Sequence, residues 1–399
     1  MAENNKKSSI IHDIVHKCHI CGNPHLDIFK KYSRFHRVTS DCKPWVRGGT
    51  LAVCLSCGCV QKLIDAAWQS ETDQIYREYT IYYQSGGEEQ ATFEQESGFS
   101  SSRSLKILNS VHSLLSLPDY GMELDIGCGN GALLRHFNQI FPQWNLYGTE
   151  LNDKYKKIVE SIPNVESLYI CDDPEHLKNT FDCITMIHVL EHIIHPQKFL
   201  ETICGKLNDR GVLIIEVPFF KKNPYDLLIA DHCTHFTEKT LSVLLKKSGF
   251  KIFYTSTEWV PKELTIIAVK NLNGEDEAIS LKKDNLRKEV LTCIEWLDSN
   301  INDSATLAKL GVFGIFGTSI AASWLFSEMQ GEVAFFVDED PNRIGKMHLG
   351  CPIYHPKNVP ENSFVFIPFC PEQANKIKTR LAAHPSDVHF VVPSKLCGE

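Results

Sequence analysis

The chain has 399 residues, with 41 Lys and Arg against 49 Asp and Glu, a formal net charge of −8. This acidic balance argues against a nucleic-acid partner and against an anionic membrane surface, because both attract basic proteins. The length allows roughly two to four domains, and the apolar content is sufficient for a sizeable core.

The N-terminal residues are polar, and no secretory signal is recognisable there. One apolar run, 311–326, is too short for a membrane span and is interrupted by Gly, Ser and Thr, so we predict a strand followed by a helix. We therefore expect a cytoplasmic protein without a membrane partner. Its 15 cysteines are then reduced thiols or metal ligands rather than a disulfide framework.

Two matching C-x-x-C pairs, each followed by glycine, occur before residue 60. Such a turn directs two thiolates at one point, and two turns supply the four soft ligands that tetrahedral Zn²⁺ prefers. Four thiolates leave no open coordination position, so we predict a structural zinc site. Cys42 and Cys59 are alternative ligands. The predicted ligand set is Cys18, Cys21, Cys54 and Cys57.

The following segments alternate between strand and helix patterns. A helix is predicted over 61–76 and an amphipathic helix over 101–117. From residue 122 we predict strands at 122–125, 145–150, 167–171, 181–187 and 211–217, helices at 131–140, 152–160, 196–207 and 238–248, and a late antiparallel pair at 250–255 and 264–270. Strands separated by helices predict a doubly wound α/β sheet, whose ligands lie beyond the carboxyl ends of the strands.

A second α/β unit follows the polar segment 272–287, which we read as a linker or the start of a surface helix. We predict its strands at 311–317, 333–338, 363–368 and 388–392, with a helix at 320–326. The expected division is a zinc-binding domain at 1–65, a substrate loop and helical linker at 66–118, a central α/β domain at 119–272 and a Rossmann-like domain at 273–399. Gly317 and Asp338 imitate half of a dinucleotide site, which either holds a phosphate or is only scaffolding.

The most informative stretch is a glycine turn between the first central strand and its helix. Gly127, Gly129 and Gly131 follow Asp125, and a second acid, Glu150, ends the next strand. The dinucleotide fingerprint is G-x-G-x-x-G, whereas the third glycine here comes one residue earlier. A carboxylate about 20 residues after the turn suits ribose hydroxyls.

This stretch resembles motif I of class I S-adenosylmethionine-dependent methyltransferases. The resemblance implies that Asp125, Gly127, Gly129 and Gly131 hold the methionine end and that Glu150 binds the ribose. It also places Asp172 at the adenine. The run from Phe181 to Pro196 is similar to the family's fourth-strand motif, so we count His188 among the cofactor-binding residues and expect His192 to face the active site.

The whole chain resembles the zinc-containing sugar C-methyltransferases, which combine a zinc domain, a central methyltransferase and a C-terminal α/β domain. The resemblance rests on the cysteine pairs, on the segment from Tyr79 to Ser85 and on 336–353. It implies a small polar acceptor, a nucleotide-linked sugar. Tyr79, Tyr82 and Tyr83 would orient that acceptor, although the same segment also fits a packed linker.

In that family a Glu-His pair supplies the base, and the matching residues here are Asp231 and His232. A carboxylate that polarises an imidazole is suited to proton removal. The family's nearby tyrosine is replaced by Ile229. A purely structural Asp-His hydrogen bond at a helix entrance is the alternative.

Other function classes remain open at this stage. His188-x-x-Glu191-His192 matches an inverted zinc-protease pattern, but a strand runs directly into it, whereas that motif needs a helix. An NAD-dependent oxidoreductase of nucleotide-sugars and a catalytically inactive interaction protein are the two alternatives to a methyltransferase. The acceptor atom and the oligomeric state are left open by the sequence.

Overall fold

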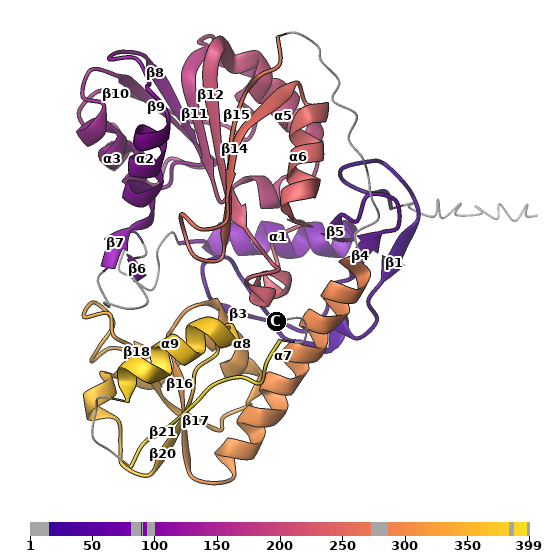
Figure 1. The fold of residues 1–399 in the computed structure, drawn as a ribbon, viewed down its shortest axis with the longest axis vertical. Helices are drawn as coiled ribbons and strands as arrows, with labels where there is room; N and C mark the ends of the chain where they lie inside the picture. The colour runs from indigo at the N-terminus through magenta and orange to yellow at the C-terminus, as the bar shows by residue number, and fades with distance from the viewer. Residues whose placement is uncertain are drawn as a thin grey trace, which may run out of the picture.

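A computed structural model describes residues 16–80, 89, 91–93, 100–272, 286–382 and 387–396. Its main sheets have four, seven and six strands, and they follow one another along the chain. Figure 1 shows the seven-stranded sheet above, the C-terminal sheet below and helix α1 (Ala66–Glu78) between them. The predicted α/β class, with an N-terminal cysteine cluster and a C-terminal sheet domain, is confirmed.

The N-terminal sheet is completed by a strand from far along the chain. Its order is β1 (Leu26–Ile28), β4 (Leu51–Cys54), β5 (Val60–Lys62) and β13 (Thr234–His235). Short elements η1 (Tyr32–Arg34), β2 (Arg37–Val38) and β3 (Pro44–Trp45) lie between β1 and β4.

The predicted helix over 61–76 was wrong at its start. β5 occupies the first positions, and α1 begins only after Asp65, whose side chain caps the backbone N–H of Trp68.

The central sheet has the order β10-β9-β8-β11-β12-β15-β14. Its first five strands pair in parallel, and β15 runs antiparallel to both of its neighbours, β12 and β14. Helices α2 and α3 cover one face and α5 and α6 the other (Figure 1). The strands are β8 (Met122–Ile126), β9 (Asn145–Glu150), β10 (Val165–Ile170), β11 (Phe181–Ile187), β12 (Leu207–Pro218), β14 (Phe250–Ser256) and β15 (Glu263–Lys270).

Short helical elements join these strands. The α-helices are α2 (Arg103–Leu114), α3 (Ala132–Ile140), α4 (Lys156–Val159), α5 (Pro196–Lys206) and α6 (Glu238–Lys247). The 3₁₀ helices are η3 (Pro174–His176), η4 (Leu190–His192) and η5 (Pro224–Leu228), and β6 (Ala91–Phe93) pairs with β7 (Ser100–Ser102) before α2. α4 is much shorter than the predicted helix over 152–160.

The C-terminal sheet has the order β18-β19-β17-β16-β20-β21. Its elements are α7 (Leu286–Ala308), β16 (Val312–Phe316), α8 (Ile320–Glu328), β17 (Val333–Val337), β18 (Met347–His348), β19 (Cys351–Tyr354), η6 (Pro356–Asn358), β20 (Ser363–Phe366), α9 (Pro371–Leu381) and β21 (His389–Val391). The long helix α7 packs on η5, where the amide of Asn300 donates to the hydroxyl of Tyr225 at 3.1 Å. Within the described residues, we find no helix whose length and apolar character would let it cross a membrane.

Candidate functional site

The four predicted cysteines come together at the edge of the N-terminal sheet. Their sulfur atoms all lie within 4.8 Å of one another, with Cys18 3.4 Å from Cys57 and Cys21 3.5 Å from Cys54. Four thiols at this spacing fit a tetrahedral Zn²⁺, whose S ligands lie about 2.3 Å from the metal. Cys59 is not one of the four, although it is buried nearby.

The cysteine cluster is tied to the segment that carries His232. His19, between the first two cysteines, has Nδ1 2.8 Å from the hydroxyl of Thr234 in β13. Its backbone N–H also donates to the side chain of Gln61 in β5. A Zn²⁺ bound to the four cysteines would therefore stabilise the N-terminal sheet, to which β13 belongs.

The glycine turn has the conformation that its sequence predicts. Gly127, Gly129 and Gly131 all have positive φ, between 58° and 80°. A Cβ on Gly127 would lie 2.7 Å from Val189, and one on Gly131 would lie 2.5 Å from Ile162. A side chain is excluded at both positions by backbone conformation and by space.

The two predicted acids flank this turn. Glu150 accepts a hydrogen bond from the backbone N–H of Gly129 at 2.6 Å. Asp125 is buried at the end of β8, and its Oδ1 lies 2.8 Å from the hydroxyl of Thr185, which also lies 2.7 Å from Glu123. One hydroxyl has a single proton, so it cannot donate to two carboxylates.

The pKa of Glu123 is shifted toward its protonated form. It is fully buried, and both its burial and the neighbouring Asp125 raise its pKa well above the usual range. A proton on Glu123 would let Thr185 bond to both carboxyl groups, accepting from Glu123 and donating to Asp125. Burial also raises the pKa of Asp125, to about 8. A positively charged ligand beside Asp125 would favour its ionised form.

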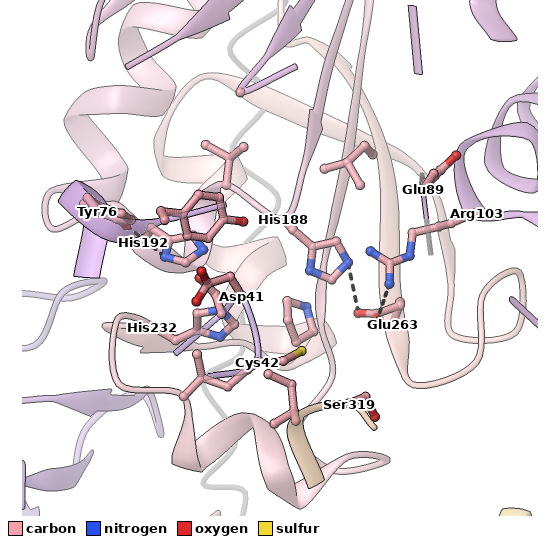
Figure 2. A pocket seen from close by; sticks show the side chains of 18 of the residues that line it. Asp41, Cys42, Tyr76, Glu89, Arg103, His188, His192, His232, Glu263 and Ser319 are labelled. Carbon is pink, nitrogen blue, oxygen red and sulfur yellow. Dashed lines mark hydrogen bonds and ion pairs between the residues drawn. The ribbon is translucent and has the colours of Figure 1, made fainter. Parts of the chain in front are cut away.

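A large cavity, about 1400 Å³ in volume, lies next to the turn. It is lined from the N-terminal part, from α1, from the carboxyl ends of the central strands and from the C-terminal sheet (Figure 2). Gly129 and Gly131 belong to the turn but not to the lining. Tyr82 and Tyr83 lie outside the described residues. The predicted site residues that line the cavity are Tyr79, Asp125, Gly127, Glu150, Asp172, His188, His192 and His232.

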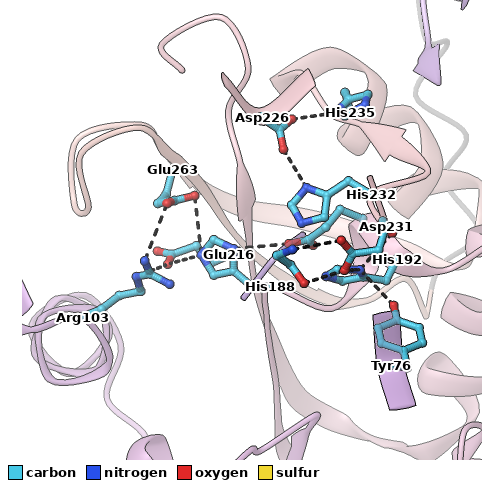
Figure 3. Close-up of polar contacts among 12 residues, drawn as sticks. Tyr76, Arg103, His188, His192, Glu216, Asp226, Asp231, His232, His235 and Glu263 are labelled. Carbon is cyan, nitrogen blue, oxygen red and sulfur yellow. Dashed lines mark hydrogen bonds and ion pairs between the residues drawn. The ribbon is translucent and has the colours of Figure 1, made fainter. Parts of the chain in front are cut away.

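The predicted Asp231–His232 hydrogen bond is wrong. Nδ1 of His232 lies 2.7 Å from the carboxylate of Asp226, whose second oxygen lies 2.7 Å from Nδ1 of His235 (Figure 3). A carboxylate only accepts, so Nδ1 of His232 carries the proton and Nε2 the lone pair. Burial opposes the charge on His232, but Asp226 outweighs it and raises the pKa.

Asp231 instead contacts Ser40, in the N-terminal part, and His192. Its carboxylate accepts from the backbone N–H of Ser40 at 2.9 Å and from the Ser40 hydroxyl at 2.5 Å. Its Oδ2 and its backbone carbonyl lie 3.5 and 3.1 Å from Nδ1 of His192. The phenol of Tyr76, from α1, lies 3.1 Å from the same nitrogen. Asp231 is thus a neighbour of His192 rather than of Nδ1 of His232.

Side chains of the N-terminal part donate hydrogen bonds to backbone carbonyls of the segment just before His232. The buried amine of Lys62 donates to the carbonyl of Ile229, and the indole of Trp68 donates to that of Ala230 at 3.0 Å. The phenol of Tyr32 donates to the carbonyl of Leu227 at 2.7 Å. Three segments thus fix the loop between η5 and β13.

His188 begins a second polar cluster, which includes Arg103, Glu216 and Glu263 (Figure 3). It has φ +55° at the end of β11, and it lies 3.3, 3.7 and 3.6 Å from Glu191, Glu216 and Glu263. Burial opposes the charge on His188, but Glu263 and the other carboxylates outweigh it and raise the pKa to about 10. Arg103 faces the same carboxylates. His188 is therefore a cation within a set of acids.

Several residues of the site were missed from the sequence. Asp226 lies six positions before His232, directly before the apolar residues 227–230, where no motif marks it. Tyr76 lies at the end of the predicted helix, three residues before Tyr79. It was therefore not counted among the tyrosines predicted to orient the acceptor. Arg103 and Ser40 come from segments distant in sequence, and only the fold brings them to the cavity.

Comparisons with known proteins agree with the glycine turn. Residues 102–255 match a protein family described as a methyltransferase domain. The match confirms the predicted enzyme class, because it covers the turn, both flanking acids and the two cavity histidines, His192 and His232. No curated protein matches the sequence.

Solved structures of methyltransferases share low similarity with the chain. An S-adenosylmethionine-dependent methyltransferase from Clostridium acetobutylicum ATCC 824 is 14% identical, with a TM-score of 0.35, over 51% of this chain and 98% of that one. The mitomycin 7-O-methyltransferase MmcR is 15% identical, with a TM-score of 0.37, over 42% of this chain and 53% of that one. CalO1, a methyltransferase in calicheamicin biosynthesis in its SAH-bound form, is 14% identical, with a TM-score of 0.33, over 40% and 52%.

Proposed function

We propose that this chain, whose residues 102–255 form a methyltransferase domain, transfers the methyl group of S-adenosylmethionine to a nucleotide-linked sugar. The observation that supports this proposal most directly is that the glycine turn and the histidines line one cavity. Turn residue Gly127 lines this cavity together with His192 and His232. A cofactor on the turn and an acceptor beside the histidines would therefore share one enclosed space.

The residues around the turn fit this cofactor. Asp125 and Glu150 offer carboxylates to a ligand that carries a sulfonium and an ammonium, and Asp172 lines the cavity beyond β10. The turn itself has no room for a side chain at Gly127, as a close backbone approach requires. When bound, the cofactor supplies an electrophilic methyl group.

His232 is the residue we assign to proton removal, with Asp226 as its positioning partner. The lone pair on Nε2 takes a proton from the acceptor while the acceptor forms a bond to the methyl carbon. The bound cofactor would give up its methyl group to the acceptor and would leave as a neutral thioether. His192, Tyr76 and Tyr79 line the same part of the cavity and would orient the acceptor.

A nucleotide-linked sugar fits the extent of the cavity. A volume of about 1400 Å³ exceeds what one cofactor fills. Thr318 and Ser319, from the loop after β16, and Arg380, from α9, contribute to the cavity wall. Lys262, from the turn before β15, also lines it. Hydroxyls and cations there suit the sugar and its diphosphate. The resemblance to zinc-containing sugar C-methyltransferases points to the same acceptor class.

The test is a screen of nucleotide-sugars with S-adenosylmethionine, read by mass spectrometry. A nucleotide-sugar that gains the mass of one methyl group, while its free sugar gains none, supports the assignment. The paired substitution Asp125→Asn with Glu150→Gln should abolish both cofactor binding and transfer. Transfer that persists in this variant contradicts the assigned cofactor site, and methylation of free sugars alone contradicts the acceptor.

A further inference from the structure

Three side chains of metal-binding type meet at the wall of the cavity. They are the carboxylate of Glu191 and the imidazoles of His192 and His232, and one donor atom of each lies within 4.8 Å of the others. The two rings stand edge to face, with centroids 4.6 Å apart. Glu191 and His192 come from η4, directly after β11, while His232 comes from the loop before β13. Figure 2 shows both histidines at the cavity.

Glu191 is a buried carboxylate, 1% exposed, whose oxygens receive no hydrogen bond from the described residues. The nearest positive group is His188, whose Nδ1 lies 3.3 Å from Oε1. Leaving a buried carboxylate without donors is costly, so native proteins pair such groups or bind a metal with them.

Both histidines present the nitrogen that a metal needs. Nδ1 of His232 donates to Asp226, and Nδ1 of His192 donates to the backbone carbonyl of Asp231. Each ring therefore keeps its lone pair on Nε2. A histidine that binds a metal usually donates the N–H of its other ring nitrogen to a nearby acceptor, which fixes the tautomer.

We propose that Glu191, His192 and His232 bind a divalent transition-metal ion. Two imidazoles and one carboxylate are a ligand set that such ions accept, and they leave coordination positions for a substrate oxygen. Donors bound at about 2.0–2.2 Å in a tetrahedral arrangement lie about 3.4 Å apart, so the three side chains would move together by at most about 1.4 Å. The site differs in chemistry from the cysteine cluster, which has only thiols.

His188 is not part of this set, although its spacing imitates a metal motif. A helix would place His188 and His192 on one face, but His188 ends a strand with φ +55°. Its ring faces Glu216 and Glu263 instead. The ligands are thus a consequence of the fold, since His232 lies far along the chain from η4.

The role of the ion rests on the proposed function, whereas its binding does not. An ion at this site would bind an acceptor oxygen and lower its pKa. His232 would then act as a ligand through Nε2, and the ion would activate the acceptor in its place. Without the ion, His232 would be the base.

The test is a titration of the full chain, its cysteine site filled with Zn²⁺, with Mn²⁺ followed by electron paramagnetic resonance. Mn²⁺ prefers nitrogen and oxygen ligands and does not displace Zn²⁺ from thiolates. Glu191→Gln is the test variant, and His192→Gln replaces it if Glu191→Gln does not fold. Glu216→Gln is the matched control, because Glu216 is equally buried and contacts His188 but is outside the ligand set.

We expect one Mn²⁺ per wild-type chain, the same in Glu216→Gln, and affinity at least about 100-fold weaker in the test variant. Equal affinity in all proteins, or no bound Mn²⁺ in the wild type, would mean that Glu191 forms an ion pair only. S-adenosylmethionine binding is measured on the same samples. Cofactor binding without Mn²⁺ overturns the metal site alone, and Mn²⁺ binding without the cofactor overturns the proposed function alone.

Discussion

Replacing Asp226 with Asn tests which carboxylate controls His232. Both oxygens of Asp226 accept imidazole hydrogen bonds of 2.7 Å in a fully buried position. Asn keeps the shape but loses the charge and one acceptor. A hydrogen bond to a charged group contributes about 1.5–3 kcal/mol, and one pKa unit corresponds to about 1.4 kcal/mol. The pKa of His232 should therefore fall by about 1–2 units.

The matched control is Asp231→Asn, because Asp231 is equally buried and lies next to His232 in sequence. Its carboxylate is held by Ser40 and faces His192, and it raises the pKa of His232 only through its charge, so its loss should lower that pKa less than the loss of Asp226 does. The assay is an NMR titration of the imidazole signals in both variants, with each chain's folding checked by urea denaturation. A larger fall in Asp231→Asn than in Asp226→Asn would refute the assignment of Asp226 as the partner.

Further predictions concern the turn, the cysteines and the pH dependence. Gly127→Ala should weaken S-adenosylmethionine binding in calorimetry, because a Cβ there would meet Val189. Gly205→Ala, in α5 with open space around it, should instead stabilise the fold by about 0.5–1 kcal/mol in urea denaturation. Elemental analysis should find one Zn²⁺ per wild-type chain, the same in Cys59→Ser and less in Cys57→Ser; equal loss in both would contradict the ligand set. Burial raises the pKa of Asp125 to about 8 from 3.8, so its contribution to stability is present in acid and is lost as pH rises through 8. Asp125→Asn should flatten that part of the urea-denaturation profile of the cofactor-free protein, and an unchanged slope would contradict the assigned pKa.

Features determined by neighbouring residues could be predicted from the sequence. A C-x-x-C-Gly turn and a strand–glycine–helix junction each depend on a few consecutive positions, so the cysteine cluster and the turn at Gly127 were predicted in place. The alternation of strands and helices gave the central sheet for the same reason. Acid Glu150 was predicted near the turn because parallel neighbours end at one edge of a sheet.

Features that depend on distant contacts were missed. The partner of His232 is decided by the turn of η5, which brings Asp226 rather than the adjacent Asp231 to the ring. Strand β13 adds to an N-terminal sheet that ends at Lys62, and nothing local in its two residues indicates this pairing. The start of α7 was predicted as a linker or as the start of a surface helix, whereas Leu286, Val290 and Leu297 are buried against the rest of the fold.

The central claim is that the turn and the histidines form one methyl-transfer site, and mass spectrometry of the reaction tests it most directly. Wild-type protein with S-adenosylmethionine and its nucleotide-sugar acceptor should add one methyl group. Asp226→Asn should still bind the cofactor in calorimetry but transfer the methyl group at least about 100-fold more slowly, within the range that one positioned acid–base group contributes. Transfer at the wild-type rate in Asp226→Asn, or none by the wild type with any nucleotide-sugar despite bound cofactor, would contradict the account.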